Sequence, residues 1–486
     1  MRRGAGQPTD ALLAAQPWQA DPLADATIAR ILGPWPEDSE LPGAQAEQWQ
    51  RINCVNRIFS TWADNAALTG WQAPPGTPDD IAQPLQSFIQ AGQILPNWAD
   101  PARIERAEVL FMDYGALSCV LLFCSSLPEC YVIPDLASVL HTAGQLEQHT
   151  EHRIRSTAAM IFPVMMHGGL TQPAGAGVAQ VLKVRLIHAT IRNLILRGAP
   201  VPGAPPGQVA PLERPADAGL YQTLFTNGWN VERDGLPCNQ AELAYTLLTF
   251  SYVFLRSLRR LGIGLPAADE EAYLHAWNVV GHVLGIDASL MVHTMDEAAQ
   301  LLDRLQARGR AQVTQPDARP ALGAALMSTM EQAMPWAIAR PFPRLMTRYL
   351  CGRTTTGDLG LSQPGAPWAS WLLFWTLLIA CRAIDTVARW FWPQFSLARS
   401  FTRVLGYHFL VKILMDQTRP LQLPVRLLHQ MGQLVAAWSD DPRAPRWINR
   451  VEDRLTTTGT WHPVPSCAKA TQLGASTAGD TPGTTR

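Results

Sequence analysis

A short stretch near the middle of the chain, KVRLIHATIR at residues 183–192, combines one histidine with two arginines. Arg185 lies three residues before His188, and Arg192 lies four residues after it. At ~3.6 residues per helical turn, the three side chains share one face of a helix, beside an apolar arc. Such a histidine is usually a packed core or surface residue, and such arginines usually form a solvated face. The alternative is a cofactor that carries both a metal and anionic groups.

Haem b has both of these features. A neutral imidazole binds haem iron axially, and the planar fork of arginine matches a propionate carboxylate. Haem b also needs no covalent link to cysteine, and none of the eight cysteines forms a CxxCH motif. The stretch therefore predicts His188 as an iron ligand, and Arg185 and Arg192 as further cofactor-binding residues.

A second pair of candidate residues lies about thirty positions upstream, in HRIRSTAAMIF. Arg153 and Thr157 are four residues apart and share a helix face, whereas Arg155 and Ser156 point elsewhere. If this helix opposed His188, a guanidinium and a hydroxyl could hold and polarise dioxygen there. We predict a catalytic role for Arg153 and Thr157, with dioxygen as co-substrate. The simpler alternative is an exposed arginine beside a threonine in the first helical turn.

The elements that must position these residues are predicted to be helices. GVAQVLKVRLIHATIRNLILRG has helical periodicity between Gly177 and Gly198, and ADPARIERAEVL starts with Asp100 as N-cap and Pro101 at the first helical position. No segment shows sustained alternation rich in Val, Ile and Thr, and there is no dinucleotide or Walker loop. We therefore predict an all-α protein, a single large helical domain with globin-like packing around a haem.

Composition divides the chain into three parts. Residues 1–45 are rich in Pro and Ala and are expected to be loose, and residues 463–486 are rich in Ser, Thr, Gly and Ala and are expected to be disordered. The helical domain is predicted to span 46–462, interrupted by a Pro-rich surface loop at 199–219.

Charge, cysteine spacing and hydropathy indicate which partners the protein binds and where in the cell it is located. The net charge of −1, without a basic run, excludes a typical nucleic-acid-binding protein. Scattered cysteines without CxxC, and an N-terminus without an apolar signal segment, predict a cytoplasmic protein with reduced core cysteines. The apolar run Trp371–Cys381 is shorter than the ~20 residues of a membrane span. It is expected to be a buried core helix, or else an interfacial helix whose tryptophans make peripheral membrane contact.

The R-x-x-x-T run and the following VRLIHATIR together resemble the catalytic domain of the latex-clearing rubber oxygenases and of a fungal oxygenase of mycophenolic acid biosynthesis. LPCNQAELAYTLLTF, EEAYLHAWNVVGHVLGI and RYLCGRTTTGDLGL extend the resemblance from about Pro96 to Leu361. Each motif alone is loose, but their order and spacing together are specific.

The resemblance implies an all-α, haem-b oxygenase. It implies that His188 is the proximal iron ligand and that Arg153 and Thr157 act on the distal side. Rubber oxygenases cleave a carbon–carbon double bond of polyisoprene with dioxygen, and the fungal relative cuts an isoprenoid side chain. The substrate class implied is an apolar isoprenoid or another alkene.

Two positions depart from the family pattern. Some rubber oxygenases have a lysine just before the threonine as a distal ligand, and this chain has Ser156 there. The family also uses a glutamate as a base, for which Glu129 is the nearest candidate, with a loop-capping role as the alternative. Two other functions remain open at this stage: a haem-binding gas sensor or carrier without turnover, and a membrane-associated scaffold that has lost the cofactor.

Overall fold

The computed structural model describes residues 8–35, 44–134, 136–139, 146–201, 203–214, 219–312, 317–362, 366–388 and 450. Helices dominate these residues, so the predicted all-α class is confirmed. The α-helices of the first half are α1 (Asp10–Ala15), α2 (Pro22–Leu32), α3 (Ala44–Ile58), α4 (Asp79–Gly92), α5 (Pro101–Leu121), α6 (Leu127–Cys130), α8 (Leu146–Met165), α9 (Gly177–Leu196) and α10 (Leu220–Phe225). Those of the second half are α11 (Val231–Asp234), α12 (Gln240–Phe250), α13 (Tyr252–Arg260), α14 (Ala267–Leu284), α15 (Met295–Ala311), α16 (Arg319–Ala333), α17 (Phe342–Cys351), α18 (Arg353–Asp358) and α19 (Trp368–Ala388).

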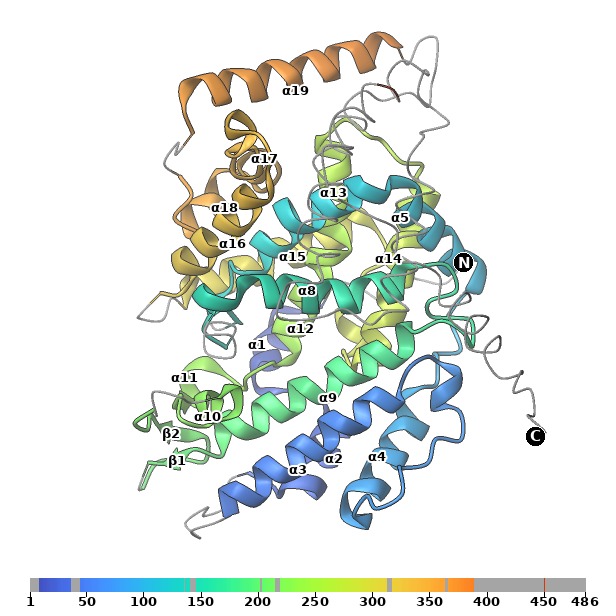
Figure 1. The fold of residues 1–486 in the computed structure, drawn as a ribbon, viewed down its shortest axis with the longest axis vertical. Coiled ribbons are helices and arrows are strands. Elements are labelled where there is room, and N and C mark those ends of the chain that lie inside the picture. The colour runs from blue at the N-terminus through green and yellow to red at the C-terminus, as the bar shows by residue number, and fades with distance from the viewer. Residues whose placement is uncertain are drawn as a thin grey trace, which may run out of the picture.

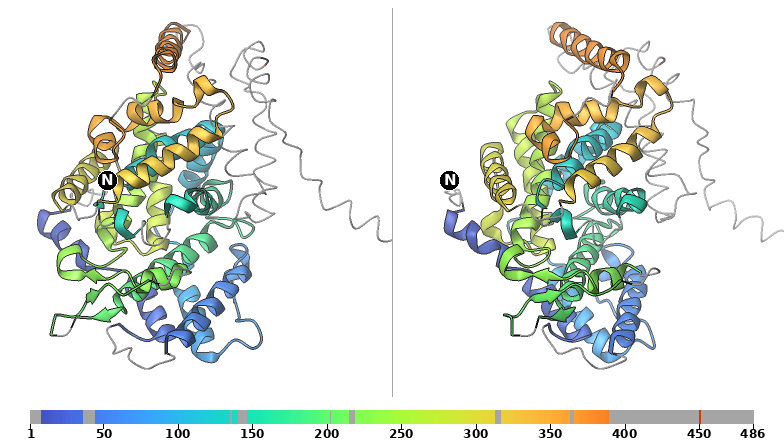
Figure 2. Two further views of the ribbon diagram at one scale, coloured as in Figure 1. Left: turned by 60° about the vertical axis from the view of Figure 1, so that its left-hand side comes forward. Right: turned by 90° about the vertical axis from the view of Figure 1, so that its left-hand side faces the viewer.

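Helix α9 lies between two layers of helices (Figure 1). It packs against α8 on one side and against α2 on another, and it also contacts α14 and α10. Helix α14 in turn packs along α5. The two further views place α2, α3 and α4 together at the end of the molecule opposite α19 (Figure 2). The chain around residue 188 is therefore enclosed by elements that come from distant parts of the sequence.

The expectation of a loose N-terminal segment at residues 1–45 is wrong for residues 8–35. Asp21 caps α2, since its side chain accepts hydrogen bonds from Leu23 N and Ala24 N, and Pro22 occupies the first helical position. Ile28 and Ile31 on this helix are buried in the main core. The Asp-Pro start signal was present in the sequence, but the surrounding Pro and Ala residues concealed it.

The Pro-rich segment 199–219 is only partly the loop that was predicted. Ala199–Pro200 (β1) pairs antiparallel with Gln208–Ala210 (β2), which pairs antiparallel with Trp229–Asn230 (β3). This small sheet follows directly after α9. It fixes the carboxyl end of that helix to the segment before α11.

Both ends of α9 fall where the glycines predicted them. The turn before α9 contains Gly168, which has φ +70°, and Gly169, where an added Cβ would lie 2.2 Å from the carbonyl oxygen of Pro163. Glycine tolerates the positive φ at Gly168, and it has no Cβ to clash at Gly169. These two glycines therefore allow the tight turn that ends α8. The helical stretch after Asn239, by contrast, is broken at Ser251 into α12 and α13.

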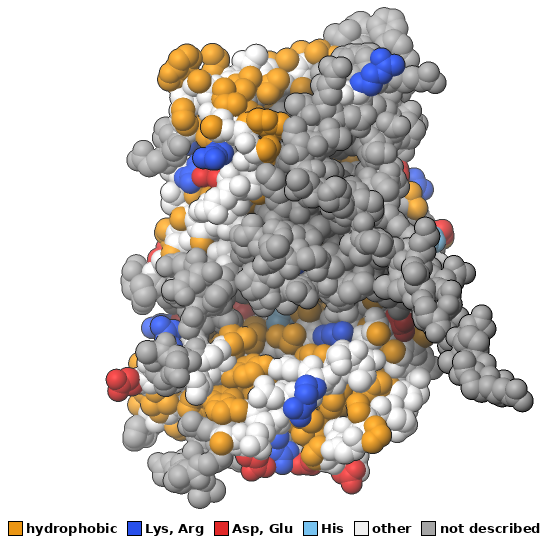
Figure 3. Space-filling view, in the orientation of Figure 1, with side chains coloured by type: hydrophobic (Ala, Val, Ile, Leu, Met, Phe, Trp, Pro, Cys, Tyr) orange, Lys and Arg blue, Asp and Glu red, His pale blue; other side chains and the backbone are white. Residues whose placement is uncertain are grey.

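Helix α19 contradicts the expectation of a buried core helix. Phe374, Leu378 and Cys381 face the body, where α19 packs on α17, but Trp368 is 79% exposed and Ile379 is 62% exposed. Figure 3 shows the resulting group of hydrophobic side chains at the top of the molecule. Among the described residues, α19 is the one unbroken helix long and apolar enough to cross a membrane, over Trp368–Thr386, and only 28% of that window is buried. The helix is longer than the apolar run alone suggested, because it includes Arg382 and Asp385.

Candidate functional site around His188

His188 lies in the middle of α9 and is half-buried. Its Nδ1 atom is buried and has no hydrogen-bond partner among the described residues. Burial lowers the pKa of His188 to about 4, with a further lowering by the positive charge of Arg192 and an opposing effect of Asp21. The imidazole is therefore neutral at physiological pH, which is the form that binds a metal ion.

Arg185 is held on the α2 side of α9. Its Nε and one terminal nitrogen donate to the carboxylate of Asp21, the latter at 2.7 Å, and its other terminal nitrogen donates to Val283 O at 3.0 Å. Its guanidinium carbon also lies 5.8 Å from the centre of the Phe88 ring. One arginine thus joins α9 to the start of α2, the end of α14 and a side chain of α4.

Arg192 is almost completely buried and makes a similar set of contacts about two turns further along α9. Its Nη1 pairs with Asp25 on α2, its Nε donates to Pro237 O at 2.9 Å, and its Nη2 donates to Cys238 O at 2.8 Å. Burial is the largest influence on Asp25 and raises its carboxyl pKa, while Arg192 lowers it. Pairing therefore offsets only part of the cost of burying this carboxylate.

The two aspartates were not identified from the sequence. Asp21 is the N-cap of α2 and Asp25 lies in its first turn, and each pairs with one of the two arginines that flank His188 in the sequence. Pairing of these arginines with haem propionates remains a prediction, and it would require the propionates to share or replace Asp21 and Asp25. In the structure as it stands, both arginines fix the orientation of α9, and with it the position of His188.

Helix α8, which packs against α9, carries the second predicted pair. Thr157 is half-buried, and Ser156, at the position of the family lysine, is exposed. Arg153 belongs to α8, but its side chain lies outside the described residues. The structure thus places the backbone of the predicted pair on the helix beside His188. It also buries Arg155 completely, which the spacing alone gave no reason to expect.

The turn between α8 and α9 is fixed by two side chains from other elements. Asn65 Oδ1 accepts from Val178 N and Ala179 N and so caps α9, while Asn65 Nδ2 donates to Gly169 O and Gln172 O, each at 2.9 Å. Glu108 on α5 accepts from Gly168 N at 2.8 Å, and its burial raises its carboxyl pKa. The relative position of the two site helices therefore depends on residues far from both.

Glu129, the candidate base, occupies a different environment from a loop cap. It lies in α6, fully buried, and its carboxylate accepts from Arg256 at 2.5 Å, from Gln306 at 2.7 Å and from Thr355 at 3.2 Å. These partners belong to α13, α15 and α18. The carboxylate links three helices through hydrogen bonds, so the loop-capping alternative is wrong, and a role as base stays a prediction.

The family model described as "ER-bound oxygenase mpaB/B'/Rubber oxygenase, catalytic domain" matches residues 115–383, which is more than half of the chain and includes α8 and α9. The chain belongs to this family. It is therefore an oxygenase, which is an oxidoreductase.

Individual relatives agree with this assignment. The chain is similar to the rubber oxygenase of Streptomyces sp. (strain K30), with 24% identity over 357 residues that cover 72% of this chain and 76% of the relative. Among solved structures it is similar to a latex clearing protein, LCP, in the closed state. That likeness has a TM-score of 0.56 and 18% identity, and it covers 87% of this chain and 91% of the other. The structural likeness shows a shared fold that extends well beyond the matched domain.

Proposed function

We propose that this protein is a haem-b-dependent oxygenase that cleaves a carbon–carbon double bond of an apolar, isoprenoid-type substrate with dioxygen. The observation that carries the proposal is the state of His188. Its neutral imidazole lies on the helix that packs against α8, inside the family's matched region, and its buried Nδ1 has no partner in the described part of the chain. Buried polar atoms are rarely left unpaired without a functional reason, so this histidine suits a bound group.

The residues have separate roles in this proposal. His188 would hold the haem iron, and bound haem would supply the electron chemistry that dioxygen needs to react with an alkene. Arg185 and Arg192 hold α9 in place through their hydrogen bonds. They are also the cations nearest His188 in the sequence, and they would pair with the haem propionates. Arg153 and Thr157 would position and polarise dioxygen from α8, the first as a cation and the second as a hydroxyl donor.

The substrate class rests on the relatives together with the chemistry of the chain. One relative is named a rubber oxygenase and one solved structure a latex clearing protein, and rubber is an apolar polymer of alkene units. Sites for such molecules need apolar walls and few charges, and only 16% of this chain is charged. We therefore propose an isoprenoid or other alkene chain as the substrate.

The test is the ultraviolet–visible spectrum of the purified protein, first ferric and then reduced with dithionite under carbon monoxide. Wild type should show a Soret band that shifts with carbon monoxide, and His188→Ala should lose the band or alter it. The matched control is His275→Gln, which replaces a buried histidine on α14 and should retain the wild-type spectrum. A wild-type protein that stays colourless after haem supplementation would overturn the proposal.

Turnover is tested separately from haem binding. Haem-loaded wild type should consume oxygen with an isoprenoid alkene and release carbonyl products detectable by mass spectrometry. Haem that binds on His188 without any oxygen consumption across a panel of isoprenoid alkenes would favour a gas sensor or carrier instead.

We also propose that α19 makes peripheral contact with a membrane. Its outward face presents Trp368, Trp371, Leu372, Ile379 and Ile384, all exposed, and tryptophan favours the membrane–water interface. Wild type should float with zwitterionic liposomes in a density gradient, and Trp368→Ser combined with Ile379→Ser should remain at the bottom. Flotation that is unchanged in this double variant would contradict the contact.

A further inference from the structure

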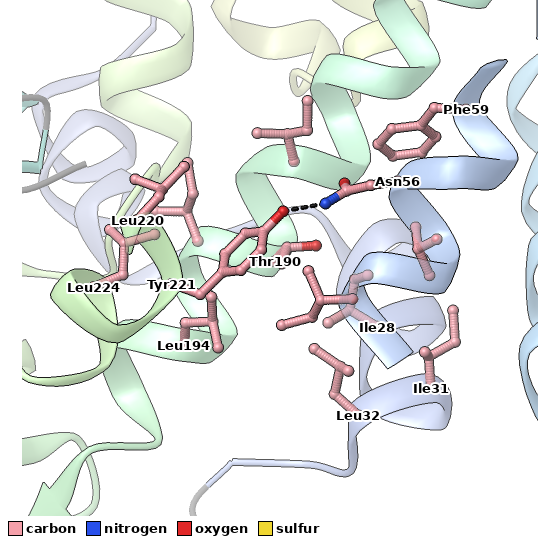
Figure 4. Close-up of a pocket in the computed structure, with 14 residues that line it drawn as sticks. Ile28, Ile31, Leu32, Asn56, Phe59, Thr190, Leu194, Leu220, Tyr221 and Leu224 are labelled. Atoms are coloured by element: carbon pink, nitrogen blue, oxygen red, sulfur yellow. Dashed lines mark hydrogen bonds between the residues drawn. The ribbon is translucent and has the colours of Figure 1, made fainter. Parts of the chain in front are cut away.

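A second site lies on another face of α9, in a cavity of about 140 Å³ between α2, α3, α9 and α10 (Figure 4). Apart from Asn56, Thr190 and Tyr221, all its lining side chains are wholly apolar. Its floor is formed by buried residues of the main core, among them Ile28, Ile52 and Leu194. We infer that this cavity binds a small apolar molecule, the size of one branched five- or six-carbon hydrocarbon unit.

Only three of the lining side chains are polar, and each makes a hydrogen bond within the protein, which favours an apolar ligand. The amide of Asn56 donates to the hydroxyl of Tyr221, and the hydroxyl of Thr190 donates to Leu186 O at 2.9 Å. Among the described residues, no charged side chain lines the cavity. A polar ligand would lose most of its hydrogen bonds with water against this largely apolar lining, so a hydrocarbon is the ligand that loses least on leaving water.

The volume sets the size of the ligand. Apolar cavities of roughly 150 Å³ stay dry and take up benzene or xenon. Five carbons buried at about 0.8 kcal/mol each correspond to a dissociation constant on the order of 1 mM. The cavity therefore suits one unit of an apolar chain, or a small free hydrocarbon, and cannot enclose a long chain.

A hydrogen bond and two stacked aromatic rings lie at the opening of the cavity. Figure 4 shows the side chains of Asn56, on α3, and Tyr221, on α10, meeting above the apolar floor. The ring of Trp49 stacks on that of Tyr221, with centroids 6.2 Å apart and planes inclined by 13°. Ile187 and Leu220 are 41% and 49% exposed at the rim. A single hydrogen bond thus joins two helices across the entrance, and its opening would admit a ligand.

The cavity is next to His188 in the sequence but not on the same face of α9. At ~100° per residue, Ile187, Thr190, Ile191 and Leu194 form a stripe centred about 110° around the helix from His188. His188 itself does not line the cavity. A hydrocarbon bound there would pack against Ile187 and Ile191, which precede and follow the proposed iron ligand in the sequence. The cavity is therefore a second site, separate from the site of the proposed reaction.

Five isoleucines line the cavity, which makes the test specific for the site: Ile28, Ile31, Ile52, Ile187 and Ile191. The probe is 2-methylbut-2-ene, chosen because the proposed substrate is an isoprenoid alkene. This choice rests on the proposed function, whereas the cavity argument does not. Protein labelled at isoleucine δ1 methyl groups is reduced and treated with carbon monoxide, so that any bound haem is diamagnetic. The methyl resonances of the five isoleucines should shift in a saturable way, with a dissociation constant near 1 mM.

Two variants separate this cavity from other apolar surfaces. Ile187→Trp places a large ring at the exposed rim and should weaken binding at least tenfold, whereas Ile338→Trp, at a similarly exposed isoleucine elsewhere, should leave it within twofold. Tyr221→Phe removes the bond across the entrance but keeps the ring, and it should speed exchange of the probe. These surface and near-isosteric changes are compatible with folding.

The outcomes keep this inference apart from the proposed function. Shifts that are absent, that occur only at Ile379 and Ile384 of α19, or that persist unchanged in Ile187→Trp would overturn the cavity site. Saturable shifts in a protein that shows no Soret band would support the cavity site and overturn the proposed haem function. A Soret band that shifts with carbon monoxide, without any methyl shifts, would support the proposed haem function and overturn the cavity site.

Discussion

Helices α9 and α14 both carry a central histidine whose pKa is lowered by burial to about 4, yet the two imidazoles differ in their partners. His275 on α14 accepts a hydrogen bond from Asp100 N at 2.9 Å, and its ring meets the Trp98 ring edge-on at 5.7 Å. His188 on α9 has a buried nitrogen without a partner among the described residues. The contacts of His275 give it a structural role at the start of α5.

The comparison shows which feature separates a structural histidine from a candidate ligand. Residue type and pKa direction are the same at both positions, so neither can distinguish them. The hydrogen bonds do: at His275 the imidazole accepts from the start of α5, whereas His188 Nδ1 has no partner among the described residues. Near His188, Arg185 forms a buried pair with Asp21 and Arg192 forms a partly buried pair with Asp25, and both pairs stabilise the position of the helix.

The largest expected loss of stability follows from breaking the buried Arg185–Asp21 pair near His188. Arg185→Met leaves Asp21 buried without its cation and should lower the free energy of unfolding by about 3–5 kcal/mol. Arg51→Met breaks the more exposed contacts with Glu47 and Asp80 and should cost about 0–1 kcal/mol. Urea unfolding followed by circular dichroism measures both. Equal losses would mean that α9 is not held by these pairs.

The next effect concerns catalysis rather than stability. Arg153→Ala and Thr157→Val should each lower the rate of alkene cleavage by about 10²–10³-fold, since each removes a group proposed to polarise dioxygen. The Soret band should remain, because the proposed iron ligand is untouched. Ser156→Ala, at an exposed neighbouring position, is the matched control and should retain at least half of the rate. Loss of haem in the Thr157 variant would assign α8 to cofactor binding instead.

The third prediction concerns how the contribution of His275, on α14, to the free energy of unfolding depends on pH. The folded-state pKa of His275 is about 4 and the unfolded value is near 6.5. Only the unfolded state takes up the proton between these values, so His275 contributes stability above pH 6.5 that is lost as the pH falls towards 4. His275→Gln keeps an acceptor for Asp100 N and cannot titrate. The stability difference between the two proteins should change by on the order of 2 kcal/mol across that range, as measured by urea unfolding at each pH.

The smallest expected loss of stability comes from removing the side-chain cap at the amino end of α9. Asn65→Ala removes the cap on Val178 N and Ala179 N and should cost about 1–2 kcal/mol. Hydrogen exchange should become faster at the first amides of α9 but not in α14. Thr294→Ala, which removes the cap of α15, serves as a comparison for an ordinary helix start. Faster exchange throughout the protein would mean that the effect is global.

Much of the secondary structure follows from local sequence signals. The periodicity and glycines of α9 and the Asp-Pro start of α5 each act within a few residues, so the sequence predicts them directly. The same Asp-Pro signal at Asp21 was overlooked within a Pro- and Ala-rich context. The interruption at Ser251 had no clear signal, because it depends on how α12 and α13 pack against other helices.

The surroundings of the site could not be predicted in the same way. Asp21 lies 164 residues from Arg185, and Asn65 lies 113 residues from Val178, so no local pattern connects these residues. The exposure of α19 also depends on what packs against it, which composition does not reveal. His188, by contrast, could be singled out from residue type, spacing and family resemblance together.

None of the seven described cysteines forms a disulfide, and six of them are buried. Burial raises the thiol pKa of Cys119, Cys124 and Cys238 to about 12. At neutral pH, a thiol with such a pKa is a thiolate for roughly one part in 10⁵ of the time, and the thiolate is the form that oxidants attack. In an oxygenase, burial thus keeps these three thiols protonated, a form that oxidants attack more slowly than the thiolate.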